Sequence, residues 1–204
     1  MSYAQISYPN VPLGDGSCGE TIASAGCYVT TDAMLLTWMG HHIDPPGLNA
    51  EYLQKGLFSG GCLIGADTVA RARPDQVAVE LVQEFPGAAD LRLCDTQTDG
   101  VYVAVRIAYP HGVPADAAAG RVHFVPLYDF TAGANPSTLR IVDSYDGQIK
   151  PLARYGDPAT IITAAMRYRA LSALLRMRLP DPVEPPTPPP APREAPPAPR
   201  DAAL

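Results

Sequence analysis

The chain has 204 residues, of which 47% are hydrophobic, and it carries a formal net charge of -6. This length suits one ordinary domain with an extension, and the apolar content is enough for a core. An acidic chain without a basic face has no electrostatic support for binding nucleic acid, so we expect no such partner. We also expect no signal peptide and no membrane span, because the start is not basic and apolar runs stay below roughly 20 residues.

The first half of the chain is predicted to be mainly helical. A helix is predicted over residues 27–40, where apolar residues recur at helical spacing and Gly40 can end it. A second, shorter helix is predicted over residues 45–56, from its proline start to a terminating glycine. Residues 75–85 are ambiguous between helix and strand.

The second half is predicted to form strands. Residues 100–109, 121–130 and 138–147 alternate apolar and polar side chains between turn-forming residues, which indicates successive antiparallel strands. Residues 158–179 are predicted to form a closing helix with arginines toward its C-terminal end. Helices followed by an antiparallel sheet are typical of the α+β class.

The composition changes sharply at Pro180. Residues 180–204 are rich in proline, which lacks the amide donor of helices and sheets, so we expect an extended or disordered tail. The folded domain is then predicted to be residues 1–179. The tail could act as a spacer, or as a strap that docks on a partner.

The four cysteines are widely spaced. Cys18, Cys27, Cys62 and Cys94 lack the paired short gaps of a structural zinc site, so we predict no metal and no cofactor. A disulfide, for example between Cys18 and Cys62, stays open if the protein meets oxidising surroundings.

Cys27 is the candidate nucleophile. A thiol at the N-terminus of a helix lies beside unpaired backbone amides and the positive end of the helix dipole, which favour the thiolate. Gly26 would let the backbone come close to a bound group. The alternative is a small cysteine buried in the core.

A nucleophilic cysteine needs a base and a group that orients the base. His123 lies in a predicted strand, and Asp143 ends the apolar part of the next one. Neighbouring antiparallel strands could place the two side by side, either as a catalytic pair or as a structural hydrogen bond. Asp146 and Gly147 form a turn signal, which makes Asp146 a poor candidate for the orienting residue.

Several short motifs now match one family in order. The chain resembles the papain-like cysteine peptidases related to the double-glycine leader peptidases, in particular their stand-alone branch in bacterial and phage cell-wall proteins. The matching residues are Gln5, Leu13-Gly14, Thr21-Ile22, Gly26-Cys27, Thr30-Thr31, Ala33-Met34, Gly40, Pro46, Leu48-Asn49, His123-Phe124-Val125 and Asp143.

This resemblance implies a papain-like fold with Cys27 as nucleophile, His123 as general base and Asp143 as the residue that orients the imidazole. It also implies that the Gln5 side-chain amide helps to stabilise the oxyanion. Three departures stand out. The aromatic segment that follows the family's glutamine is weaker after Gln5. Ser144 replaces the family's proline, and Cys18, which is followed by glycine as in exporter-type relatives, is a rival nucleophile.

The resemblance further implies a cysteine peptidase, and we hypothesise that it cleaves a peptide bond in peptidoglycan, in a stem peptide or a cross-bridge. Such an enzyme could be a phage lysin that reaches the cell wall through holins, or could be carried on a virion. Two alternatives use the same fold: an assembly module of a phage tail docked by residues 180–204, and a transglutaminase or acyltransferase with the same triad.

Overall fold

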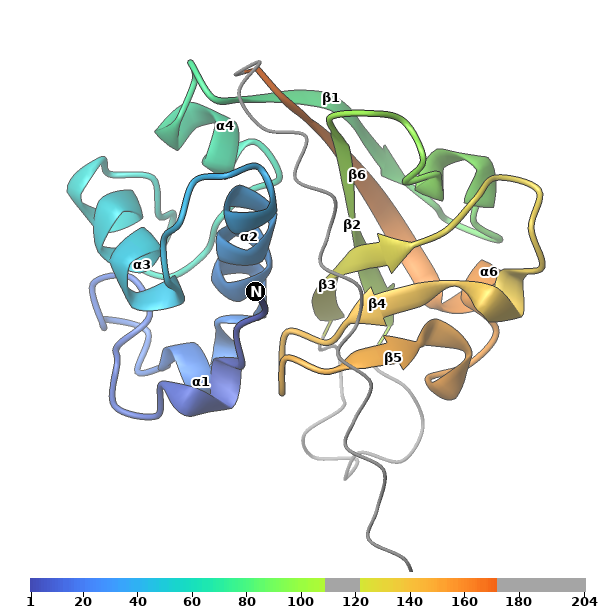
Figure 1. Ribbon diagram of the computed structural model, residues 1–204. Helices are drawn as coiled ribbons and strands as arrows, with labels where there is room; N and C mark the ends of the chain where they lie inside the picture. The colour runs from blue at the N-terminus through green and yellow to red at the C-terminus, as the bar shows by residue number, and fades with distance from the viewer. Residues whose placement is uncertain (109–121, 172–204) are drawn as a thin grey trace, which may run out of the picture.

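A computed structural model describes residues 1–108 and 122–171. These form two halves that lie side by side in Figure 1. We call residues 1–72 the helical half, and residues 77–108 with 122–171 the sheet half. The predicted tail at 180–204 lies outside the described residues.

The helical half is built around one central helix. Its elements are η1 (Gln5–Ser7), α1 (Ile22–Ala25), α2 (Cys27–Trp38), α3 (Pro45–Gln54) and α4 (Thr68–Ala72). The predictions of helices over residues 27–40 and 45–56 are confirmed by α2 and α3. Gly40, at a φ of 91°, follows the end of α2, and the Asp44 side chain caps the start of α3 by accepting from the Gly47 amide at 2.8 Å.

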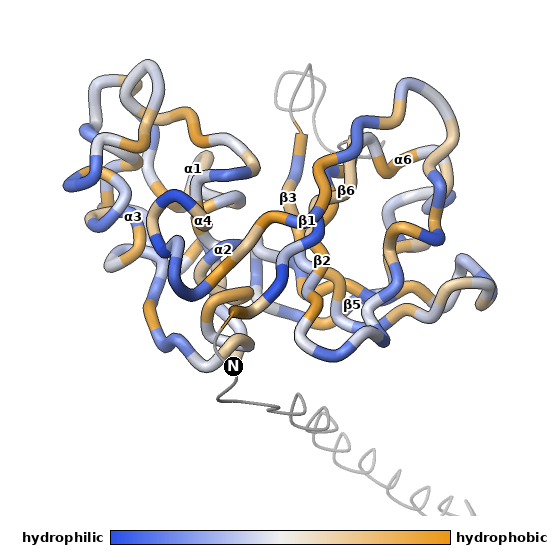
Figure 2. The backbone as a smooth tube through the Cα atoms, turned by 90° about the horizontal axis from the view of Figure 1, so that it is seen from above, coloured by the Kyte–Doolittle hydropathy of each residue, from blue (hydrophilic) through white to orange (hydrophobic). Residues whose placement is uncertain are grey.

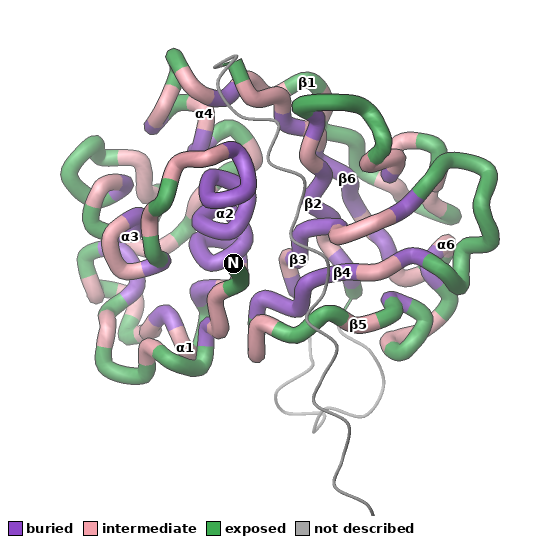
Figure 3. The backbone as a smooth tube through the Cα atoms, in the orientation of Figure 1, coloured by how far each residue is buried: buried purple, intermediate pink, exposed green. Residues whose placement is uncertain are grey.

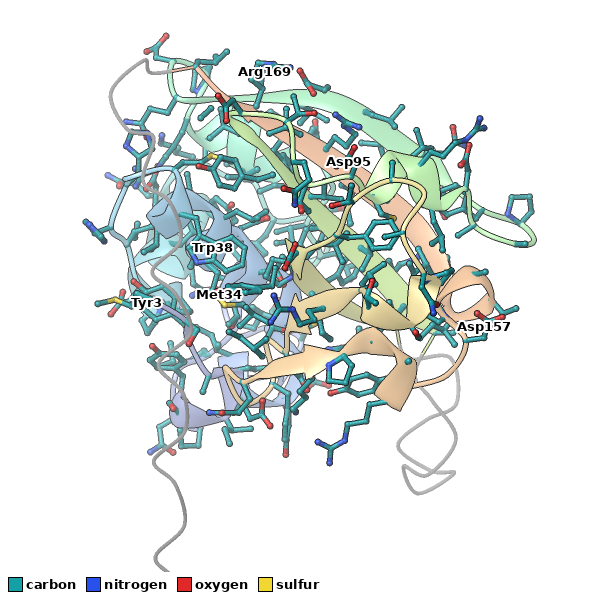
Figure 4. The ribbon with its side chains drawn as sticks, turned by 45° about the vertical axis from the view of Figure 1, so that its right-hand side comes forward. Tyr3, Met34, Trp38, Asp95, Asp157 and Arg169 are labelled. Carbon is teal, nitrogen blue, oxygen red and sulfur yellow. The ribbon has the colours of Figure 1, made fainter. Side chains whose placement is uncertain are left out.

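Helix α2 is enclosed by the rest of the molecule. Every residue from Tyr28 to Trp38 is buried, as the continuous purple of α2 in Figure 3 shows. Part of this cover comes from the N-terminal segment, since Tyr3 hydrogen-bonds Thr37 and the Trp38 indole donates to the Met1 carbonyl. Figure 4 shows Tyr3, Met34 and Trp38 in this region. A helix covered on all sides keeps its first residue in a fixed place.

The sheet half holds six strands, joined by short helical turns. Its elements are β1 (Val77–Glu84), η2 (Leu91–Cys94), β2 (Val101–Ala108), β3 (Val122–Asp129), η3 (Pro136–Thr138), β4 (Arg140–Val142), β5 (Ile149–Pro151), η4 (Leu152–Arg154), α6 (Pro158–Ile161) and β6 (Ile162–Ala170). The order across the sheet is β1-β6-β2-β3-β4-β5, with antiparallel neighbours throughout. The α+β class and the three predicted strands are confirmed, and the ambiguous segment is a strand.

The predicted closing helix over residues 158–179 is wrong. In the described part of that range, residues 158–171, only the turn α6 is helical, and the chain continues as β6, a central strand paired with β1 and β2. Residues 172–179 of the predicted helix lie outside the described residues. Ile161, Ile162 and Thr163 are β-branched and favour an extended backbone, and hydrogen bonds from strands on both sides outweigh the helix propensity of the alanines and arginines that follow.

Both faces of the sheet are covered. One apolar cluster joins the helices to one face of the sheet through Ala104, Val142, Met166 and Tyr168. A second cluster fills the opposite face, beneath the connections that carry η2, η3 and η4. Apolar segments therefore run through the interior of both halves in Figure 2. Within the described ranges, no helix combines the length and apolarity needed to cross a membrane.

Candidate active site

Cys27 is the first residue of α2. The short helix α1 precedes it and is fixed by a capping box, in which the Ser24 amide donates to the Thr21 hydroxyl at 3.2 Å and the Thr21 amide donates to the Ser24 hydroxyl at 2.9 Å. Cys27 is half-buried, whereas the rest of its helix is buried. The thiol is therefore held at a rigid helix end and remains within reach of solvent.

Gly26 separates α1 from α2 and has a packing role. A Cβ at this position would lie 2.7 Å from both the Cα and the carbonyl oxygen of Ile22. The close approach that Gly26 allows is thus to the backbone of α1, and no bound group is needed to explain the glycine, in contrast to the expectation from the sequence.

His123 and Asp143 meet across β3 and β4. His123 is the second residue of β3, and Asp143 directly follows β4, the strand paired with β3. The His123 Nε2 atom lies 2.8 Å from the Asp143 Oδ1 atom, and both side chains are buried. The neighbouring strands thus place the two residues together, as predicted.

His123 also interacts with Cys27. Burial acts to lower the pKa of His123, but hydrogen bonds with Asp143 and Cys27 outweigh it and raise the pKa to about 9. The structure therefore brings both Cys27 and Asp143 to His123.

Contacts next to Cys27 and His123 join the helical half to the sheet half. Tyr28 and Phe124, the residues after Cys27 and His123, stack with ring centroids 4.1 Å apart. The Phe124 carbonyl accepts hydrogen bonds from Thr31 at 2.9 Å and from Ser144 at 2.7 Å. Ser144, which replaces the proline of the family that the sequence resembles, thus hydrogen-bonds the β3 backbone next to His123.

Asp143 is surrounded by hydrogen-bond donors. Its Oδ2 atom accepts from the Lys150 amine at 2.6 Å and from the Tyr155 hydroxyl, and its Oδ1 atom also accepts from the Tyr145 amide at 2.9 Å. Burial acts to raise the pKa of Asp143, but the bonds to His123, Lys150 and Tyr155 hold it well below its usual range. Asp143 is therefore negatively charged and held in place by its hydrogen bonds.

Lys150 and Tyr155 were not identified from the sequence. Lys150 lies on β5 and Tyr155 directly after η4, so the β4–β5 pairing and the following turn bring them to Asp143. The turn signal at Asp146 and Gly147 already indicates a hairpin. A lysine on the second strand of that hairpin is the sequence signal from which Lys150 could have been identified. Lys150 also binds Asp146 at 2.6 Å, so Asp146 has a partner as well as a turn role.

Gln5 lies beside the same hairpin. Its backbone amide donates to the Ser144 carbonyl at 2.8 Å, and its buried side chain donates through Nε2 to the Ala23 carbonyl of α1 at 2.9 Å. In the described part of the chain its Oε1 atom has no hydrogen-bond partner. The Nε2 atom carries a second hydrogen, which an oxyanion beside Cys27 could accept.

The rival nucleophile lies elsewhere. Cys18 is in the turn before α1 and contacts Cys62, whereas Cys27 contacts His123. Of the two cysteines that the sequence leaves as candidate nucleophiles, the structure thus favours Cys27.

Other features of the described residues do not compete with this site. A pocket of about 380 Å³ lies at the far end of α2, lined in part by Trp38, Tyr102 and Tyr128, and neither cysteine nor histidine lines it. Among the residues that the structure describes, no group of three or more His, Cys, Asp or Glu side chains could hold a metal ion.

Comparisons with family models, with curated proteins and with solved structures return no match to this chain. The interpretation of the site therefore rests on its own geometry.

Proposed function

We propose that the protein is a papain-like cysteine peptidase that hydrolyses a peptide bond through Cys27, His123 and Asp143. The observation that carries this proposal is that His123 interacts with both Cys27 and Asp143. An acyl-transfer site needs a nucleophile, a base and an orienting group in mutual contact, and the three residues meet this requirement.

The arrangement of the halves supports the papain-like interpretation. The nucleophile begins a buried helix, while the base and the carboxylate lie on an antiparallel sheet packed against it. The residues also follow the chain order Cys, His, acidic residue, which papain-like peptidases use.

The proposed reaction has two stages. His123 takes the proton of the Cys27 thiol, and the sulfur attacks the carbonyl carbon while the carbonyl π electrons move to oxygen. The Cys27 amide has no partner within α2, because it is the first helical residue, and with the Gln5 side chain it can donate to this oxyanion. His123 then gives its proton to the leaving amine as the C–N bond breaks.

Hydrolysis of the thioester completes the cycle. His123 removes a proton from water, and the water oxygen attacks the thioester carbonyl. The C–S bond then breaks as His123 returns the proton to the sulfur, which releases the acid and restores the Cys27 thiol. Throughout, Asp143 keeps the imidazole oriented and stabilises its protonated form, aided by Lys150 and Tyr155.

For the substrate we propose a peptide bond of peptidoglycan, in a stem peptide or a cross-bridge. This rests on the resemblance of the motifs around Cys27 and His123 to the cell-wall branch of the family. The half-buried thiol at the end of α2 suits attack on a peptide presented from solvent.

The first test is thiol reactivity. The protein is treated with limiting iodoacetamide from about pH 5 to about pH 9, and peptide mapping locates the label. We expect Cys27 to react faster than Cys18, Cys62 and Cys94 at the acidic end, and we expect His123→Ala to remove this advantage. Equal reactivity of all four thiols would contradict the proposal and favour an assembly module.

A product test then addresses the substrate. Purified peptidoglycan is incubated with the wild-type protein and with Cys27→Ala, and new amine and carboxyl ends are identified by mass spectrometry. Cys27-dependent release of both ends supports hydrolysis. Transfer of the acyl group to an added amine instead of water would assign an acyltransferase.

A further inference from the structure

Two loops of the helical half are locked together beside the start of α1. One is the turn at residues 13–20, closed by a hydrogen bond from the Leu13 amide to the Glu20 carbonyl at 2.9 Å. The other is the tight loop at residues 59–63, closed by two backbone bonds between Ser59 and Leu63 at 2.7 and 2.9 Å. Each loop carries one half-buried cysteine, Cys18 or Cys62.

Glycines allow these loops to touch. A Cβ at Gly14 would lie 1.8 Å from the Gly61 carbonyl oxygen, and a Cβ at Gly61 would lie 2.0 Å from the Ser17 hydroxyl. The Asp15 amide donates to the same Gly61 carbonyl at 3.1 Å. Since Ser17 precedes Cys18 and Gly61 precedes Cys62, the contact fixes the two cysteines opposite each other.

The thiols themselves are in contact. A hydrogen bond with Cys18 is the main cause that raises the pKa of Cys62 to about 11, and burial and the nearby Glu20 and Asp15 carboxylates raise it further. Neither thiol belongs to the group of Cys27, His123 and Asp143. Their pairing is therefore not explained by the proposed reaction.

We propose that Cys18 and Cys62 form a thiol–disulfide site that an external small-molecule disulfide oxidises to an intramolecular cross-link. One thiolate attacks a sulfur of the reagent R–S–S–R, which forms a mixed disulfide and releases one R–S⁻. The second cysteine attacks the protein sulfur of this mixed disulfide and releases the other R–S⁻. Two electrons pass to the reagent, and the two thiol protons end on two R–SH molecules.

The cross-link joins the turn that leads into α1 to a loop far along the chain. The hydrogen bond from the Asp15 amide to the Gly61 carbonyl already holds the two loops against each other. A cross-link that restricts the unfolded chain over this span stabilises the folded state. Oxidation is therefore expected to strengthen the helical half.

The test uses bis(2-hydroxyethyl) disulfide, a neutral reagent that the Asp15 and Glu20 carboxylates do not repel. The reduced full-length protein is oxidised, free thiols are blocked with N-ethylmaleimide, and peptides are mapped. We expect a loss of two hydrogens from the intact mass, a peptide linking Cys18 to Cys62, and a rise in Tm of roughly 5–10 °C that dithiothreitol reverses.

Variants separate this site from the candidate active site. Cys18→Ser and Cys62→Ser are expected to lose the rise in Tm, whereas Cys27→Ala is expected to keep it. A map of the wild-type protein that shows only mixed disulfides, or a bond to Cys27 or Cys94, would overturn the proposal, as would a Cys18–Cys62 bond with unchanged Tm. Either result leaves the proposed peptidase function untouched, because the experiment measures no activity.

Discussion

The two halves of the molecule hold their parts of the candidate site in different ways. The helical half presents Cys27 at the end of a helix that is fixed by apolar packing on all sides. The sheet half presents His123 and Asp143, which are buried and tied to Lys150 and Tyr155 through hydrogen bonds and charge. The helical half thus fixes the position of the candidate nucleophile, and the sheet half supplies the charged and hydrogen-bonding partners of His123.

One residue of the helical half departs from this description of apolar packing. Asp32 is a buried carboxyl group on α2, and it accepts a hydrogen bond from the Tyr52 hydroxyl at 2.8 Å. Burial raises its pKa to about 8, although the bond to Tyr52 opposes this. The helical half therefore also contains an ionisable group, whose effect should appear in stability.

The largest predicted effect follows from Asp32. A folded-state pKa above the unfolded value near 4 gives stability that is complete at low pH and is lost as the pH rises toward about 8. The free energy of unfolding should fall by about 1 kcal/mol per pH unit in this window, or on the order of 4 kcal/mol in all. Urea titrations at several pH values measure this slope.

Asp32→Asn should flatten the slope, and Asp67→Asn is the matched control because Asp67 is exposed in the same half. If both variants keep the wild-type slope, Asp32 does not titrate in this range, and the helical half is held by apolar packing alone.

The second prediction tests the charged network. Asp143→Asn removes the negative charge that keeps His123 protonated and oriented, so the alkylation rate of Cys27 near neutral pH should fall about 100-fold. Asp146→Asn should change this rate less than about twofold, because Asp146 contacts Lys150 and not the imidazole. Equal damage from both variants would show that Asp143 has no special role.

The third prediction tests the position of the nucleophile. Gly26→Ala places a methyl group 2.7 Å from the Ile22 backbone, so the joint between α1 and α2 must shift. We expect a loss of about 2 kcal/mol in the free energy of unfolding. The control is Gly87→Ala, where no atom lies within 4 Å and the change should stay within about 0.5 kcal/mol.

The fourth and smallest effect concerns Lys150. Lys150→Met leaves Asp143 with its hydrogen bonds to His123, Tyr145 and Tyr155. The substitution removes the positive charge of the Lys150 amine that pairs with the Asp143 carboxylate. Because Lys150 helps to lower the pKa of Asp143, the acid limb of Cys27 alkylation should move to higher pH, with a rate loss of about tenfold.

The only other lysine in the chain serves as the control for this variant. Lys55→Met removes a partly exposed ion pair with Glu51 in the helical half, and it should leave the pH profile unchanged. A profile that is the same for wild type and Lys150→Met would limit the role of Lys150 to packing.

Two helices of the helical half, α2 and α3, could be predicted because their signals are local, whereas the short helices α1 and α4 were not predicted. A glycine or proline at each end and apolar side chains at helical spacing are enough to predict α2 and α3. In the sheet half, the pairing of His123 with Asp143 could be predicted because their strands are consecutive in sequence and adjacent in space.

The remaining parts depend on contacts that no short segment encodes. The stretch after Pro158 has the alanines and arginines of a helix, and only pairing with β1 and β2 makes it a strand. Lys150 and Tyr155 are ordinary surface residues in the sequence and become part of the site through the fold of the β4–β5 hairpin and η4. Likewise, the role of Gly26 depends on how α1 packs, which the residue type alone does not reveal.

The position of β6 has a consequence for biosynthesis. The last described strand lies between β1 and β2, so β1 has no partner in the sheet until the ribosome has made residues 162–170. The helical half and the β2–β3–β4–β5 segment contain mostly shorter-range contacts and can form earlier. We therefore expect nascent chains that stop before β6 to expose the edges of β1 and β2, which makes these intermediates candidates for chaperone binding.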